Sequence, residues 1–116
     1  MQIKILFIAI LGWSTAFAVE NITGTTWVVK DNDGYVTTLT FESKNECTYY
    51  FVTTDAGNEG IRYRNCKWTQ NKNVVVFEFN NHFAVYSGVL AQDSLAGSWV
   101  SNRGPRKGTF QATKVR

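Results

Sequence analysis

Apolar and polar residues alternate along most of the chain, in short runs that are separated by clusters of turn residues. The runs are rich in valine, threonine, phenylalanine, tyrosine and tryptophan, which favour strands. The turn clusters lie at residues 30–34, 42–46, 55–58, 70–73, 80–81, 92–94 and 102–106. Seven turns of this kind predict eight strands of about five to nine residues each.

Short connections predict that strands consecutive in sequence pair in an antiparallel manner. Eight strands joined in this way can close into an up-and-down β-barrel, which leaves no strand edge exposed. A sandwich of two sheets is the alternative, but it needs longer crossovers than the sequence contains. We therefore predict an all-β fold, an eight-stranded antiparallel up-and-down (meander) β-barrel.

The first 18 residues have a different pattern, that of a secretory signal peptide. Lys4 precedes an apolar run from Ile5 to Leu11, and the stretch ends in Ala16-Phe17-Ala18. The run is too short to span a membrane, and a small-x-small ending is typical of a cleavage site. We predict a signal peptide over residues 1–18, a single domain over 19–116 without a membrane span, and a secreted or periplasmic location.

Both cysteines of the chain lie in one predicted hairpin. A hairpin centred between Ala56 and Gly57 places Cys47 directly opposite Cys66. Because an exported chain meets oxidising conditions, we predict a disulfide between them, which contributes about 3 kcal/mol in the chain-entropy model. Two cysteines and the single His82 are too few ligands for a structural zinc site, so we predict no metal.

The same hairpin register assigns side chains to two faces. One face carries both cysteines with Tyr49, Phe51, Arg62 and Arg64, and buried arginines are costly, so we predict that this face is outside. The opposite face is then predicted to point inward, and its residues are Thr48, Tyr50, Val52, Ile61, Tyr63 and Asn65. A β-bulge at residues 65–67 is then needed to return Trp68 to the core.

The next hairpin, with a two-residue type I′ turn at Asn80-Asn81, pairs Phe77 with Ala84 and Glu78 with Phe83. With Glu78 in water, Val75, Phe77, Phe79, Ala84 and Tyr86 face inward. The two hairpins together predict a partner-binding outer wall of aromatic, arginine and valine side chains, which is typical of protein interfaces. Its residues are Tyr49, Phe51, Arg62, Arg64, Val76, Phe83 and Val85.

Motifs for catalysis are missing from the sequence. His82 is not accompanied by a nucleophile elbow or a phosphate loop, and Asp31 and Asp33 lie in a turn, where Asp is favoured for local backbone hydrogen bonds. The formal charge of +3 falls to +2 without Lys4, which is a small basis for nucleic-acid binding. We predict that the protein is not an enzyme and has no cofactor. Nucleic-acid binding through Arg62, Tyr63, Arg64 and Lys67 is a third, less favoured alternative to the two binding functions below.

Two short motifs, Gly24-Thr25-Thr26-Trp27 and Gly97-Ser98-Trp99, resemble the glycine–tryptophan strand starts of small secreted meander barrels. These are the avidins, the lipocalins and the bacterial metalloprotease inhibitors. The resemblance implies a lipocalin/streptavidin-like barrel with a binding role. Lipocalins have one residue between the first Gly and Trp, whereas here there are two. The ligand-facing tryptophans of avidins cannot be matched residue by residue, so the resemblance does not imply biotin binding.

Two non-catalytic functions remain open. The region 19–116 contains fourteen aromatic residues (three Trp, five Tyr and six Phe), enough to fill a small barrel. We therefore predict an exported binding protein that engages a protein partner through the outer wall, in an inhibitor- or immunity-like role. The alternative is a calycin-type barrel that holds a small apolar ligand at its mouth.

Overall fold

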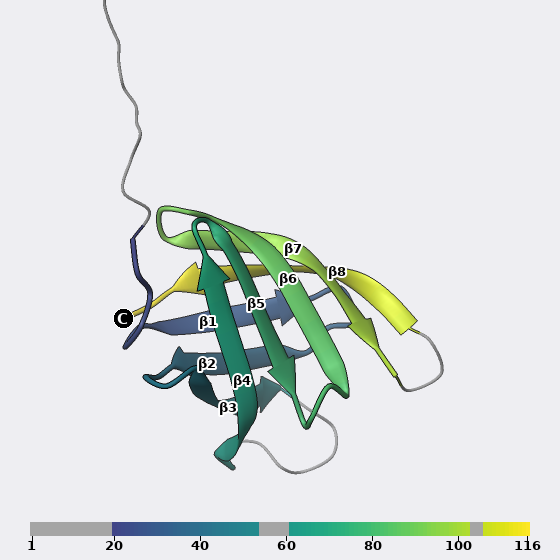
Figure 1. The fold of residues 1–116 in the computed structure, drawn as a ribbon. Helices are drawn as coiled ribbons and strands as arrows, with labels where there is room; N and C mark the ends of the chain where they lie inside the picture. The colour runs from purple at the N-terminus through teal and green to yellow at the C-terminus, as the bar shows by residue number, and fades with distance from the viewer. Residues whose placement is uncertain (1–19, 54–60, 103–105) are drawn as a thin grey trace, which may run out of the picture.

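A computed structural model describes residues 20–53, 61–102 and 106–116 of the chain and shows a closed barrel of eight antiparallel strands in sequence order (Figure 1). This confirms the predicted meander barrel. The predicted signal peptide and the predicted turn at 55–58 lie outside the described residues. The strands are β1 (Thr26–Asp31), β2 (Val36–Phe41), β3 (Glu46–Thr53), β4 (Tyr63–Asn71), β5 (Val74–Phe79), β6 (Ala84–Ala91), β7 (Ser94–Ser101) and β8 (Arg106–Lys114).

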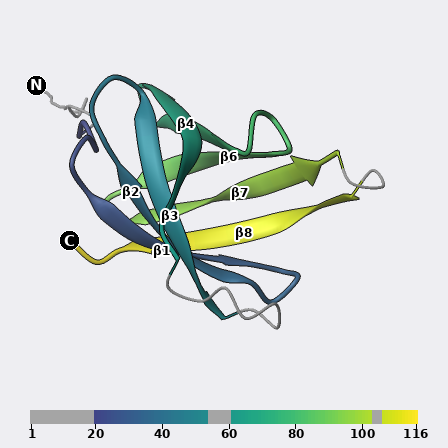
Figure 2. The same cartoon turned by 90° about the horizontal axis from the view of Figure 1, so that it is seen from below.

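The pairing of the first strand with the last closes the barrel. Val28 of β1 lies opposite Thr38 of β2 on one side and opposite Thr113 of β8 on the other. Backbone hydrogen bonds between Thr26 and Arg116 extend this seam to the end of the chain. Figure 2 shows β1 beside β8 when the barrel is viewed from below. Closure gives every described strand two hydrogen-bonded neighbours and separates an inside from an outside.

Large aromatic side chains fill the middle of the barrel. Phe41 contacts Trp68 and Phe77 with ring centroids 4.9 and 5.8 Å apart, and Phe77 contacts Phe110 at 5.6 Å. Phe41 and Phe77 are fully buried, as the period-two pattern of β2 and β5 requires. The predicted inward positions of the β5–β6 hairpin are confirmed, since Val75, Phe77 and Tyr86 are buried and Phe79 and Ala84 pack against the core.

One end of the barrel is plugged by the segment that precedes β1. Ile22 is 1% exposed, and its backbone N–H donates a hydrogen bond to Gln70 Oε1. Gln70 Nε2 in turn donates to the carbonyl oxygen of Glu20. Figure 1 shows this segment in purple beside the C-terminus, at the same end of the barrel. This closed end leaves the opposite end, which carries the β1–β2 and β5–β6 turns, as the open one.

The predicted disulfide is confirmed, but the face that carries it is inside rather than outside. Cys47 and Cys66 are joined, with their Cα atoms 4.9 Å apart. Both cysteines and Tyr49 are buried, whereas Val52 and Ile61, which were expected to face inward, are about half exposed. Tyr50, also expected inside, lies under the exposed Arg62, whose Cζ is 5.4 Å from the ring centroid.

A β-bulge in β4 is the reason for this inversion. Cys47 pairs with Cys66 and Tyr49 pairs with Tyr63, so β4 has one residue more than β3 between these two pairs. The bulge puts Cys66 and Tyr63 inside and leaves Arg64 outside. A hairpin without it would place the arginines and the cysteines on one face. Trp68 is buried, as predicted, because it lies two residues from the inward Cys66 in uninterrupted pairing with β5. The bulge therefore precedes Cys66, at Arg64 and Asn65, and overlaps the predicted range 65–67 only at Asn65.

Two glycines allow β6 and β7 to approach each other inside the barrel. Gly88 pairs with Gly97, and a Cβ atom on Gly97 would lie 2.0 Å from the carbonyl oxygen of Ser87 and 2.6 Å from Cα of Gly88. A Cβ atom on Gly88 would lie 2.8 Å from Cζ of Phe110. The glycine of the Gly97-Ser98-Trp99 motif is thus required by backbone packing.

We predict that Gly97→Ala lowers the free energy of unfolding by about 1–3 kcal/mol, because the added methyl group meets backbone atoms that cannot move away. Urea denaturation followed by circular dichroism measures the change. Ser98→Ala, at the neighbouring exposed position, should change stability by less than about 0.5 kcal/mol and is the matched control. Equal stability of the two variants would contradict the packing argument.

Candidate functional site

A cavity of about 440 Å³ occupies the open end of the barrel, and we call it the mouth cavity. Its volume falls in the range of pockets that hold small molecules. It is lined by aromatic side chains (Tyr35, Tyr49, Phe51, Tyr63, Phe79, Phe83, Tyr86, Trp99), by Asp31, Asp33 and Arg106, and by Thr37, Asn65, Asn80, Ala84 and Ser101. A hollow of similar volume at the closed end is lined mainly by polar side chains, with Trp68 as its one aromatic residue. Of these two hollows of the described residues, the mouth cavity is the one that combines apolar walls with polar groups.

An aromatic arc forms much of the wall, and we define it as Phe51, Tyr49, Phe79, Tyr86 and Trp99. Consecutive rings are in contact, with centroids 5.8, 4.4, 5.3 and 6.1 Å apart in that order. The arc follows the inward positions of β3, β5, β6 and β7 at the open end. Because each ring is packed against the next, the arc presents aromatic surface in a fixed orientation.

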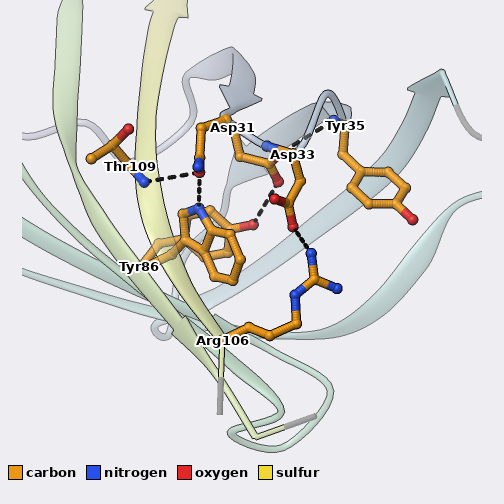
Figure 3. A network of polar contacts seen from close by, with 8 residues as sticks. Asp31, Asp33, Tyr35, Tyr86, Arg106 and Thr109 are labelled. Atoms are coloured by element: carbon orange, nitrogen blue, oxygen red, sulfur yellow. Dashed lines mark hydrogen bonds and ion pairs between the residues drawn. The ribbon is translucent and has the colours of Figure 1, made fainter. Parts of the chain in front are cut away.

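The acidic side of the cavity is formed at the turn between β1 and β2. Asp31 Oδ1 accepts hydrogen bonds from the backbone N–H groups of Asp33 and Tyr35, at 3.0 and 3.1 Å. Its Oδ2 accepts a hydrogen bond from the Tyr86 hydroxyl at 3.2 Å. Figure 3 shows these contacts. The expected turn role of Asp31 is thus observed, and the same carboxylate also reaches the aromatic arc.

An ion pair between Asp33 and Arg106 connects the β1–β2 turn to the start of β8 (Figure 3). The Asp33 side chain is 26% exposed and that of Arg106 is 54% exposed. Such exposed pairs contribute about 0–1 kcal/mol to stability, so the role of this pair is chiefly to position the two groups at the rim. Two carboxylates and one guanidinium therefore line the cavity among the described residues.

Asn32 fixes the last member of the arc. Trp99 Nε1 and the backbone N–H of Thr109 both donate hydrogen bonds to Asn32 Oδ1, each at 3.0 Å. This arrangement needs a glycine at position 108, since a Cβ atom there would lie 2.0 Å from Asn32 Oδ1 and 2.7 Å from Trp99 Nε1. The indole of Trp99 is thereby held against both the β1–β2 turn and β8.

A second polar network lies across the barrel, at β3, β4 and the β5–β6 turn. The Tyr49 hydroxyl donates to Asn65 Oδ1 at 3.0 Å, and Asn65 Nδ2 donates to Asn80 Oδ1 at 3.1 Å. Asn80, Asn81 and His82 all have positive φ, between 56° and 70°. This conformation suits asparagine better than most residues, so the turn chemistry matches the sequence.

The β5–β6 turn differs from the predicted one. It contains residues 80–83 rather than Asn80 and Asn81 alone, and Phe77 pairs with Tyr86 instead of Ala84. The register is shifted by two residues, which preserves the inside and outside assignment of the strands. Phe83, however, leaves the strand for the turn and lines the mouth cavity.

The seven residues of the predicted outer wall do not share one surface. Tyr49, Phe51 and Phe83 line the mouth cavity. Arg62, Arg64, Val76 and Val85 lie on the outside, where Arg62 donates a hydrogen bond to Thr48 Oγ1 at 3.2 Å. The expectation of a single aromatic and arginine wall is therefore wrong, because the bulge in β4 and the longer β5–β6 turn separate its members.

Several residues of the site were not recognised from the sequence, namely Asp31, Asp33, Tyr86, Trp99 and Arg106 as a group. The inward position of Tyr86 was expected, but nothing in the sequence indicates that its hydroxyl meets a carboxylate 55 residues away. Strand parity is a signal that could have found them, because inward-facing residues near the same end of a barrel lie close together.

Across the described residues, no group of three His, Cys, Asp or Glu side chains could hold a metal ion. None of the described segments forms a helix long and apolar enough to cross a membrane.

No protein-family model and no curated protein matches the sequence. Solved structures do match. The bradavidin2–biotin complex is 21% identical with a TM-score of 0.58, over 81% of this chain and 98% of that one. Apo short afifavidin is 18% identical with a TM-score of 0.52, over 85% and 100%. The rhizavidin–biotin complex is 14% identical with a TM-score of 0.50, over 84% and 98%.

The fold is avidin-like. The resemblance drawn from the two glycine–tryptophan motifs is confirmed at the level of the fold for the avidins, and the resemblance to metalloprotease inhibitors is not supported. The expected protein partner is also overturned, because the outer wall is not one surface and the avidin-like structures that match include complexes with the small molecule biotin. The aromatic residues fill only part of the avidin-like barrel and leave its mouth open.

Tyr86 is the most strongly perturbed titratable group of the avidin-like mouth. Burial raises the pKa of its hydroxyl far above the usual range, and the neighbouring charge of Asp31, its hydrogen bond with Asp31 and the charge of Asp33 act in the same direction. Burial, with Tyr63, also raises the pKa of Tyr49. Both hydroxyls therefore stay protonated in the folded barrel at a pH where a free tyrosine ionises.

We predict that the free energy of unfolding falls as the pH rises above about 10. There the unfolded chain loses the Tyr86 proton while the folded chain retains it, so the folded state binds more protons and the slope is negative, up to about 1.4 kcal/mol per pH unit for one group. Tyr86→Phe should make the slope shallower, as measured by denaturant titration at several alkaline pH values. Phe79→Leu is the control for lower stability alone. An unchanged slope in Tyr86→Phe would show that this hydroxyl does not govern alkaline unfolding.

Proposed function

We propose that this protein is a non-enzymatic binding protein that holds a small organic molecule in the mouth cavity. The observation that carries the proposal is the cavity itself, with a volume of about 440 Å³ and the aromatic arc as its wall. Pockets that bury most of a small ligand have this construction of apolar walls and few polar groups. The calycin-type alternative drawn from the sequence therefore replaces the protein-partner interpretation.

The packing of the barrel explains why a ligand would enter from this end. Ile22 and the contacts of Phe41, Trp68 and Phe77 occupy the closed end and the middle. Toward the open end the inward side chains line the mouth cavity, where the Tyr86 and Tyr49 hydroxyls are bound to Asp31 and Asn65. Ring stacking on the arc would supply the main contact with a flat or cyclic ligand.

We predict that a ligand of this cavity stabilises the native protein but not a variant with a blocked mouth. Ala84→Trp adds a large ring at a position that lines the cavity, and Val89→Trp adds the same ring on the outside of the same strand, where Val89 is 54% exposed. A panel of small ring compounds, with biotin included because bradavidin2 and rhizavidin are solved with it, is screened by thermal unfolding. At 100 times Kd a ligand adds about 2.7 kcal/mol.

A compound that raises Tm in the native protein and in Val89→Trp, but not in Ala84→Trp, supports the proposal. Circular dichroism checks that both variants fold. Equal shifts in all three proteins would place the binding elsewhere, and no shift with any compound of the panel would count against a small-molecule function.

We also propose that the protein is exported and that residues 1–18 are removed. The pattern of Lys4, the apolar run and Ala16-Phe17-Ala18 supports this, and so does the disulfide between Cys47 and Cys66, which forms in oxidising compartments. The expected intact mass of the protein released from an expressing cell is that of a chain starting at Val19 with the disulfide formed. A mass that includes Met1 would contradict export through this signal.

A further inference from the structure

Two of the tyrosine hydroxyls that line the mouth cavity, those of Tyr86 and Tyr49, can offer a ligand acceptors rather than donors. Tyr86 donates its hydrogen to Asp31, and Tyr49 donates its hydrogen to Asn65. A hydroxyl has one hydrogen and two acceptor lone pairs. While these two hydrogen bonds persist, each hydroxyl therefore has only its oxygen available for a ligand.

Three groups with nitrogen donors around the cavity also bind protein atoms. Trp99 Nε1 donates to Asn32 Oδ1, and Asn65 Nδ2 donates to Asn80 Oδ1. The Arg106 guanidinium binds Asp33 at the rim, and its side chain is 54% exposed. A carboxylate, in contrast, has about four acceptor sites and no donor, so Asp31 and Asp33 add to the acceptor character of the cavity.

The charges of the lining residues also favour a positively charged ligand. Two carboxylates and one guanidinium give a net negative charge among the described residues of the lining. The exposed guanidinium acts through water, where charge interactions are screened, whereas Asp31 is half-buried beside aromatic rings and acts in a lower dielectric. Lys30 and Lys107, which adjoin Asp31 and Arg106 in the sequence, are exposed, and Lys107 pairs with the outward Val100.

The aromatic arc is the third feature, after the hydrogen-bond acceptors and the negative charge, that suits a positive ligand. Aromatic faces attract cations as well as flat rings. Phe79, Tyr86 and Trp99 are consecutive in the arc, and Tyr86 connects it to Asp31. A positive group placed at this junction meets ring faces, a hydroxyl oxygen and a carboxylate together. A negative group at the same place would meet a like charge and no available donor among the hydroxyls of Tyr86 and Tyr49.

Building on the proposed function, we infer that the ligand of the mouth cavity is an organic ammonium ion, a protonated amine that carries a flat ring system. Its N–H groups fit the acceptors of Tyr86 and Asp31, its charge fits the acidic side, and its ring fits the aromatic arc. Phe51 and Tyr49, farther along the arc, contact the ring system.

The test compares three probes that share an indole ring and differ in charge at neutral pH: tryptamine (positive), tryptophol (neutral) and indole-3-propionate (negative). Isothermal titration calorimetry on the disulfide-bonded protein measures their affinities. Tryptamine should bind at least about tenfold more tightly than either of the others, equivalent to about 1.4 kcal/mol. Its advantage should decrease at higher salt, because screening weakens charge interactions near the rim.

Variants that neutralise one carboxylate show which residues cause the preference for tryptamine. Asp31→Asn and Asp33→Asn each remove one negative charge from the cavity and should lower tryptamine affinity by about tenfold while affecting tryptophol little. Asp93→Asn removes the same charge at the closed end, in the β6–β7 turn next to Lys114, and should leave all three affinities unchanged. Thermal unfolding checks that each variant is folded, and the comparison of the three probes on the native protein stands even where a variant is unstable.

Each outcome decides the inference. Equal binding of the three probes, blocked by Ala84→Trp, would leave the small-molecule function in place and overturn the cation preference. Tighter binding of indole-3-propionate would show that Arg106 dominates the cavity and would also overturn it. Binding of none of the three probes would overturn the ammonium class, and the screen with Ala84→Trp would then judge the small-molecule function separately.

Discussion

Pairing of β1 with β8 is the constraint on which the rest of the structure depends. It turns eight short strands into a cylinder, so that every second residue of each strand faces the same enclosed space. Ile22 fills one end of that space, and Phe41, Phe77 and Phe110 fill its middle. The mouth cavity lies at the other end, where Asp31 meets β8. The location of the site thus follows from closure and from the short segment before β1.

The architecture could be predicted from sequence because alternation and turn residues are local signals. Strand number, strand order and the partner of Cys47 all follow from spacing alone. The face of the β3–β4 hairpin could not be predicted in the same way. A single extra residue between Tyr63 and Cys66 reverses the parity. The parity of Trp68 indicates a bulge in this region, but nothing in the sequence indicates that the extra residue precedes Cys66. A local irregularity of one residue therefore decided whether Tyr49 was assigned to the core or to the surface.

The candidate site was harder to predict because its residues meet only after closure. Asp31 was correctly expected to hold a turn through backbone hydrogen bonds, yet the same carboxylate also accepts the Tyr86 hydroxyl, 55 residues away. Asn32 and Trp99 are similarly joined over 67 residues. Strand parity can say that these side chains point inward near one end. It cannot say which of them hydrogen-bond, since that depends on how the barrel twists and how each turn is built.

The hydrogen bonds of the Tyr86 and Tyr49 hydroxyls also determine what the mouth cavity can recognise. If the Tyr86 and Tyr49 hydroxyls were released from Asp31 and Asn65, each could turn its hydrogen toward a ligand acceptor. The cavity would then lose its preference for ligand groups that donate hydrogen bonds. Because these hydroxyls are partly or largely buried, leaving Asp31 or Asn65 without its partner would be unfavourable. Rigidity and selectivity therefore have the same origin: the polar contacts that stabilise the rim leave acceptors and negative charge facing the cavity. An ammonium ligand can bind there without breaking those contacts, whereas a carboxylate ligand would meet the like charge of Asp31.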